Sequence, residues 1–255
     1  MKPYYKYLPV DRIDYLESEL LRFTQPIDLN DPFECLPGKP SSEEYDRAVE
    51  QICQSLYAQT SSSVEKENIK KWASELLTEN LYNNANDSVN AEIGILSLSK
   101  NWNSTLMWSH YTDCHKGYCI GFNKNHSFFE KYINNNGTKS KILKEVVYSK
   151  NRVQIPMDMN APKLTYEPFI TKACGWDYEE EIRVISTLNL SNKNFKGKLC
   201  DVHLFKVPFD AIDEIIMGVN ISPLNEEKIR KFGIEKNIRV HKCKISDKEF
   251  NMERE

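Results

Sequence analysis

Short apolar runs separated by polar turns dominate the chain from residue 93 onward. Residues 93–99, with the sequence IGILSLS, predict a buried strand. Similar runs predict strands at 118–122, 143–148, 181–186, 202–207, 212–217 and 238–243. Nearer the N-terminus, residues 4–8 and 21–24 predict two short strands. Because helices interrupt these strands irregularly, without βαβ spacing, we expect an α+β fold with a mixed, mainly antiparallel sheet.

Helical patterns are concentrated between the early strands and residue 93. Ser41 and Glu44 have the spacing of a capping box, which predicts a helix from there to about residue 56. A second helix is expected over 64–81, and others over 10–20 and 224–232.

We expect one α+β domain over residues 1–245, with a helical insertion at about 38–88. The 40% hydrophobic and 11% aromatic content of the 255 residues is enough for a sizeable core. Residues 246–255 are polar and are expected to form a fraying tail.

Composition and charge narrow the class of protein. The net charge of −3 gives no global attraction to nucleic acid. No stretch approaches the ~20 apolar residues needed to span a bilayer, and residues 1–16 lack the apolar run of a signal peptide. The seven cysteines are scattered, which favours reduced thiols over a disulfide framework. We therefore expect a cytoplasmic protein without membrane contact, and the oligomeric state stays open.

The acidic segment WDYEEEIRVI, residues 176–185, is the strongest candidate for chemistry. In an extended chain, Glu179, Glu181 and Arg183 point to the same side. Burying such a row unpaired costs free energy, so these side chains are expected to border a cleft or to pair with one another. The alternative is a charge ladder on a half-exposed strand.

A second candidate segment, residues 106–122, predicts a short helix that ends near Gly117 and leads into a strand. His110 and Cys114 lie one helical turn apart in it. His110 is a candidate general acid, base or hydrogen-bonding group, and a structural core histidine is the alternative. No second ligand pair with zinc-site spacing accompanies it, so no metal is expected.

Two further polar features are weaker signals. Asn30 and Asp31 precede a proline, so they either stiffen a loop or present a side chain to a ligand. Ser97 and Ser99 point the same way from their strand, and their hydroxyls either face a ligand or bond neighbouring backbone. Trp176 and Phe33 are expected to be structural anchors.

Together these motifs resemble, in order along nearly the whole chain, a bacterial family known as domain of unknown function 2971. The matching positions are Tyr5–Tyr7, Asn30–Glu34, Leu96–Ser99, Met107–Tyr111, His115–Gly117, Val147–Tyr148, Lys172, Trp176–Arg183 and Ile216–Gly218. The resemblance implies one shared pocket and leaves the activity open. The residues expected to bind substrate there are Tyr5, Lys6, Asn30, Asp31, Ser97, Ser99, Trp108, Tyr111, Lys172 and Arg183.

A looser likeness to ADP-ribosyltransferases of the Arg-Ser-Glu type suggests a reaction. Such enzymes carry an early Arg, a Ser-x-Ser strand and a late Glu-x-Glu. Ser97-x-Ser99 and Glu179-x-Glu181 occur here in that order, whereas Lys6 would have to replace the Arg, or else Arg22.

This second likeness implies NAD as a co-substrate. Glu181 would stabilise the oxocarbenium-like transition state as nicotinamide leaves, and Glu179 would position or deprotonate the acceptor. An aromatic side chain, Tyr111 or Trp108, would stack on the nicotinamide. Replacing Glu181 with Gln is expected to leave folding nearly unaffected, because it removes one of two adjacent carboxylates.

Three functions are consistent with these residues. The first is an ADP-ribosyltransferase-like enzyme, a toxin or phage-defence effector, that acts on an unidentified protein or nucleic-acid acceptor. The second is a non-catalytic module that senses a nucleotide or a protein through the same pocket. The third is a nuclease or phosphodiesterase that uses His110 and Glu181. In each case His110, Tyr111, Glu181 and Arg183 are expected to converge with Asn30 or Asp31 in one partly buried site.

Overall fold

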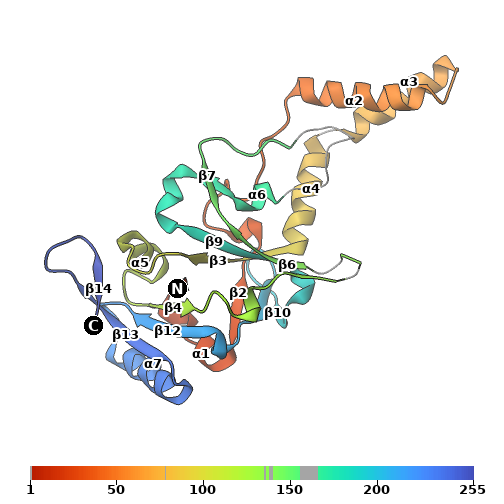
Figure 1. The fold of residues 1–255 in the computed structure, drawn as a ribbon. Helices are drawn as coiled ribbons and strands as arrows, with labels where there is room; N and C mark the ends of the chain where they lie inside the picture. The colour runs from red at the N-terminus through yellow and green to blue at the C-terminus, as the bar shows by residue number, and fades with distance from the viewer. Residues whose placement is uncertain (1, 78, 135, 138–139, 156–165) are drawn as a thin grey trace.

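A mainly antiparallel sheet forms the centre of the computed structural model, which describes residues 2–77, 79–134, 136–137, 140–155 and 166–255 (Figure 1). Within these residues the sheet has nine strands in the order β14-β13-β12-β4-β1-β3-β9-β6-β5. Their bounds are β1 Tyr4–Leu8, β3 Ile93–Ser99, β4 Tyr118–Phe122, β5 Tyr132–Ile133, β6 Ser140–Glu145, β9 Glu181–Thr187, β12 Ile212–Met217, β13 Arg239–Ile245 and β14 Met252–Arg254. Neighbours run antiparallel apart from β12 and β13, which pair in parallel. The predicted α+β class is confirmed.

Smaller elements surround this sheet. A three-stranded sheet consists of β10 (Lys193–Phe195), β11 (Val202–Lys206) and β2 (Leu20–Phe23), and a parallel pair consists of β7 (Val147–Ser149) and β8 (Thr171–Ala173). The short helices are α1 (Tyr15–Ser18), α5 (Thr105–Tyr111) and α6 (Glu167–Ile170), and the longer α7 spans Pro223–Lys236. Among the described residues, no helix has the length and apolar character needed to cross a membrane.

The helical insertion consists of α2 (Ser42–Tyr57), α3 (Ser63–Leu76) and α4 (Glu79–Glu92). Figure 1 shows α2 and α3 side by side, projecting away from the sheet, and α4 returning to it. Ser41 and Glu44 form the predicted capping box at the start of α2. The single helix expected over 64–81 is instead two helices, because Leu77 leaves the helical conformation (φ −88°, ψ 74°).

The strand alternation of β3 separates a core face from a polar face. Leu96 and Leu98 enter the main hydrophobic core, where Val184 of β9 also lies. On the opposite side, Ser97 pairs with Arg183 and Ser99 pairs with Glu181 across the β3–β9 ladder. Because residues directly opposite each other in a ladder point to the same face, the polar side chains of both strands gather on that face.

Two local expectations differ from the structure. The helix predicted over 10–20 is two short turns, because Glu19 takes a left-handed conformation (φ 59°) that ends α1. The C-terminal segment expected to fray contains β14, which pairs with β13. Arg254 of β14 donates to buried Glu214 (2.8 Å) and to the Tyr5 hydroxyl (3.1 Å), and these bonds hold the segment against the sheet.

Candidate functional site

A polar cavity lies beside β3, between the points where β3 pairs with β1 and with the residue that follows β2. Tyr5 of β1 pairs with Ser99 at one end of β3, and Thr24, just after β2, bridges to Ile95 at the other end. Between these points Lys6 Nζ donates to the Ser97 carbonyl (3.0 Å). The cavity has a volume of about 250 Å³. Its lining residues are Tyr5, Lys6, Tyr7, Thr24, Asp28, Leu29, Asn30, Glu34, Ser97, Leu98, Ser99, Met107, Tyr111, Lys172, Glu179 and Glu181.

A buried ion network forms one wall of this cavity, which we call the acidic cavity. Lys172 Nζ lies 2.5 Å from a Glu34 oxygen, 2.5 Å from Glu179 and 3.3 Å from Glu181. Arg183 binds both oxygens of Glu181 through Nε (2.8 Å) and Nη2 (2.9 Å), and Nη2 lies 3.1 Å from Glu34. All five side chains are buried. Three carboxylates and two cations therefore share one water-poor volume, where their interactions are strong.

Arg183 is the anchor of the network. Its residue is 0% exposed, and Nη1 donates to the Phe169 carbonyl (2.8 Å). Nη1 also lies 3.8 Å from the Cys35 sulfur. Because every side of the guanidinium has an acceptor, the cost of burying its charge is offset. Glu179, Glu181 and Arg183 are therefore buried and paired within the ion network, and they do not form a charge ladder on a half-exposed strand.

The two carboxyl groups of the Glu-x-Glu pair have opposite pKa shifts. Burial acts to raise the pKa of Glu181, but Arg183 and Lys172 outweigh it and hold that pKa at about 2. Burial raises the pKa of Glu179 above its usual range, although Lys172 acts against this. Neighbouring acids whose environments separate their pKa values are typical of sites where one stays ionised and the other exchanges protons.

Hydroxyl groups position this pair. Tyr111 donates to a Glu179 oxygen and accepts from Asn30 Nδ2 (3.1 Å). Ser99 Oγ donates to the Glu179 carbonyl (2.6 Å), and the Glu181 backbone N–H donates to the Tyr148 hydroxyl (2.8 Å). Residues from four distant segments thus hold the two acids in place.

The route by which Glu179 reaches the cavity differs from the expectation. Residues Cys174–Glu179 form a 3-10 helix, and β9 begins only at Glu181. Glu180 between them has a left-handed conformation (φ 44°). This turn brings Glu179 and Glu181 to the same Lys172, although they do not share one extended strand.

Four of the predicted site residues do not line the cavity. Arg183 lies directly behind it, and Asp31 is buried in the loop, where its carboxylate accepts from the Phe33 N–H (2.9 Å). Trp108 is fully buried and donates to the Trp102 carbonyl (2.7 Å), so it is placed as a core residue. His110 is exposed, with its ring 6.4 Å from that of Tyr111 and 6.0 Å from that of Tyr178.

Glu34 is the network residue that sequence reasoning missed. It belongs to the NDPFE motif, but only Asn30 and Asp31 were proposed to reach a ligand. The expected anchor Phe33 is instead 62% exposed, because the loop turns Glu34 inward and Phe33 outward. Trp176 is half-buried, with Lys172 Nζ 4.8 Å from its ring centre.

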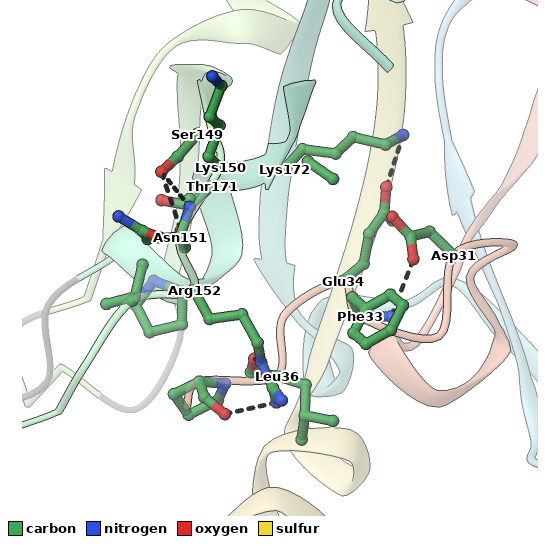
Figure 2. Close-up of a pocket in the computed structure, with 14 residues that line it drawn as sticks. Asp31, Phe33, Glu34, Leu36, Ser149, Lys150, Asn151, Arg152, Thr171 and Lys172 are labelled. Atoms are coloured by element: carbon green, nitrogen blue, oxygen red, sulfur yellow. Dashed lines mark hydrogen bonds and ion pairs between the residues drawn. The ribbon is translucent and has the colours of Figure 1, made fainter. Parts of the chain in front are cut away.

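A second cavity, of about 290 Å³, lies on the other side of the Glu34–Lys172 ion pair. Figure 2 shows this pair at one end, with Lys150, Asn151 and Arg152 at the other. Arg152 donates through Nη2 to the Pro37 carbonyl (2.6 Å) and through Nε to the Leu36 carbonyl (3.0 Å). These bonds connect the segment that follows β7 with the segment that precedes α2.

Lys6 gives the acidic cavity a pH-dependent charge. Removal of its ammonium from water lowers its pKa from 10.5 to about 8, although Glu181 acts to raise it. Below about pH 8, Lys6 is protonated in both the folded and the unfolded chain, so the full free-energy cost of burying its charge opposes folding. Between about 8 and 10.5 only the unfolded chain retains it, so this cost falls as pH rises.

We therefore expect the stability of wild type relative to Lys6→Met to increase between roughly pH 7.5 and pH 10. Urea unfolding of both proteins at the two pH values measures the difference, and titrations shared by the two proteins cancel. A difference that stays constant across this range would contradict the assigned environment of Lys6.

The fold and site define an α+β protein with an acidic cavity beside strands β1, β3 and β9 of its central sheet. Residues 107–184 match the model of the family described as "Protein of unknown function (DUF2971)", which confirms the predicted resemblance over this range. The matched range contains Tyr111, Lys172, Glu179, Glu181 and Arg183. The search of curated proteins and the search of solved structures each found no match to this chain.

Proposed function

We propose that the acidic cavity cleaves the bond between nicotinamide and ribose in NAD and transfers the ADP-ribosyl group to an acceptor. One observation carries this proposal. Three neighbouring strands, β1, β3 and β9, bring Lys6, Ser97 and Glu181 to one cavity. Along the chain these strands follow the order of the Arg-Ser-Glu pattern, with Lys6 at the position of the early Arg, Ser97 in the Ser-x-Ser strand and Glu181 in the late Glu-x-Glu.

The charge of the cavity suits the cationic end of NAD. Among the lining residues, four carboxylates (Asp28, Glu34, Glu179 and Glu181) outnumber two ammonium groups (Lys6 and Lys172), while Arg22 and Arg183 pair with Asp28 and Glu181 from outside the lining. The nicotinamide ring of NAD is positively charged, and the ribose becomes positive as the ring departs. An acidic, partly closed cavity stabilises both charges, and the low pKa of Glu181 keeps it ionised at neutral pH.

The reaction balances with residues of this chain. The bond from the ribose carbon C1′ to the ring nitrogen breaks, and its electron pair leaves with neutral nicotinamide. An O–H or N–H group of the acceptor then bonds to C1′ and loses its proton to the Glu179 carboxylate, whose raised pKa suits a base. The ring of Tyr111, which lines the cavity, provides an aromatic face for the nicotinamide.

Release of free nicotinamide from NAD by the purified protein tests this proposal. NADH is the matched control ligand, because it keeps every other group of NAD but has an uncharged ring that is a poor leaving group. We expect nicotinamide release from NAD, unchanged by a metal chelator, and none from NADH. NAD that binds without release would favour a sensing module, and chelator-sensitive cleavage of nucleic acid would favour a nuclease.

The geometry gives less support to the nuclease. His110 is exposed and does not line the cavity that contains Glu181. Within the part of the chain that the structure describes, no group of three or more His, Cys, Asp or Glu side chains has the arrangement of a metal site.

A further inference from the structure

A cavity of opposite charge adjoins the acidic cavity. It has a volume of about 570 Å³ and lies beside the start of β1 and the end of β14. Four cations line it against two carboxylates: Lys2, Lys100, Arg239 and Arg254 against Asp213 and Glu214. We call it the basic cavity, and its excess of positive charge stands out in a chain whose net charge is −3.

Part of this positive charge is neutralised by the protein, since Lys100 Nζ lies 3.2 Å from Glu145, and part is not. Arg254 satisfies Glu214 (2.8 Å), yet its Nε is buried without a hydrogen-bond partner in the described structure. Lys2 and Arg239 are exposed and have no hydrogen-bond or ion-pair partner among the described residues. Cations that face one cavity without carboxylates to balance them favour an anionic ligand there.

Two segments connect the basic cavity with the acidic cavity. Tyr5 lines both of them, and its hydroxyl donates to Glu214 (3.0 Å). Asn101 lines the basic cavity; its N–H donates to Ser99 Oγ (3.0 Å) and its carbonyl accepts from Tyr7 (2.9 Å), and both of these residues line the acidic cavity. The two cavities therefore lie next to each other along β1.

We infer that the basic cavity binds the diphosphate of a dinucleotide whose nicotinamide riboside end occupies the acidic cavity. This inference rests on the proposed function and specifies how its substrate lies. NAD has a cationic ring at one end and a doubly charged diphosphate in its middle, so its charges match the order of the two cavities. Lys2 and Arg239 contact the phosphate oxygens, while Lys100 stays paired with Glu145 and Arg254 mainly shapes the cavity through Glu214.

ADP is the probe for this subsite, because it carries the diphosphate and lacks the nicotinamide riboside. Calorimetric titration should show ADP binding to wild type, with an affinity that falls as salt increases. Lys2→Gln with Arg239→Gln should weaken it about 100-fold, since a charge-assisted hydrogen bond contributes roughly tenfold for each cation. Both side chains are exposed, so this double variant should remain folded.

The matched control is Arg47→Gln with Lys228→Gln, which removes one exposed arginine and one exposed lysine outside both cavities. This control should bind ADP as wild type does. Equal affinity of the two double variants, or no ADP binding by wild type, would overturn the inference.

NAD turnover separates the two proposals. If the Lys2→Gln, Arg239→Gln variant releases nicotinamide with an unchanged KM, the proposed function stands and the diphosphate subsite is wrong. If ADP binding depends on these cations and no protein releases nicotinamide, the subsite stands and the proposed function is wrong. A raised KM with little change in kcat supports both, because the subsite binds substrate without contacting the reacting bond.

Discussion

Replacing Arg183 with Met is expected to lower the free energy of unfolding by about 3–5 kcal/mol, because it leaves buried carboxylates uncompensated. Glu181 loses both of its hydrogen bonds from the guanidinium, and Glu34 loses its contact at 3.1 Å. Lys172 alone then faces three buried acids. Urea unfolding measures the change as a shift of the midpoint at constant slope.

Arg47→Met is the matched control, since Arg47 is an exposed arginine on α2 and its loss should change stability by less than about 0.5 kcal/mol. The double variant Arg183→Met, Glu181→Leu should be less destabilised than the sum of its single variants, because it removes the acid along with its partner. If Arg183→Met were as stable as Arg47→Met, the ion network would not have the assigned role.

Patterns that depend on neighbouring residues predicted much of the fold. The alternation and apolar runs at 93–99, 118–122 and 212–217 gave strands with the bounds that the structure has. The capping box at Ser41 is similarly local, since both of its hydrogen bonds join residues three apart. Such features are set by side-chain period and short-range hydrogen bonds, which a single sequence displays.

The sequence shows no local pattern for the left-handed backbone turns at residues other than glycine. Glu19 and Glu180 take left-handed conformations that ordinary residues rarely adopt, and these turns end α1 and set apart Glu179 from β9. Tertiary contacts hold them, so propensity alone predicts a continued helix and a longer strand. The predicted burial of Phe33 was wrong for a related reason. No local pattern in the loop indicates that Glu34 points inward and Phe33 outward.

The candidate site was partly predictable because the resemblance named residues in every segment that lines it. What the sequence could not show was which charges meet. The contact of Lys172 with three acids joins segments separated by up to 138 positions along the chain, from residue 34 to residue 172. Local repulsion between Glu179 and Glu181 was therefore overestimated, since Lys172 and Arg183 compensate both.

Glu181→Gln should slow nicotinamide release from NAD by about 10²–10³-fold, the usual effect of removing one preorganised electrostatic contact. It should also cost about 1–3 kcal/mol of stability, in contrast to the nearly unaffected folding expected from the sequence. The amide nitrogen of Gln cannot accept a hydrogen bond, so one donor of Arg183 loses its acceptor. Thermal melting beside wild type sets an assay temperature at which both proteins are folded.

The rate of nicotinamide release by wild type and by Glu181→Gln, measured side by side at that temperature with saturating NAD, tests the central claim most directly. The account predicts release by wild type and a loss of at least about 100-fold in the variant, with NAD binding retained. Equal rates in the two folded proteins, or no release by wild type from any preparation that binds NAD, would contradict it.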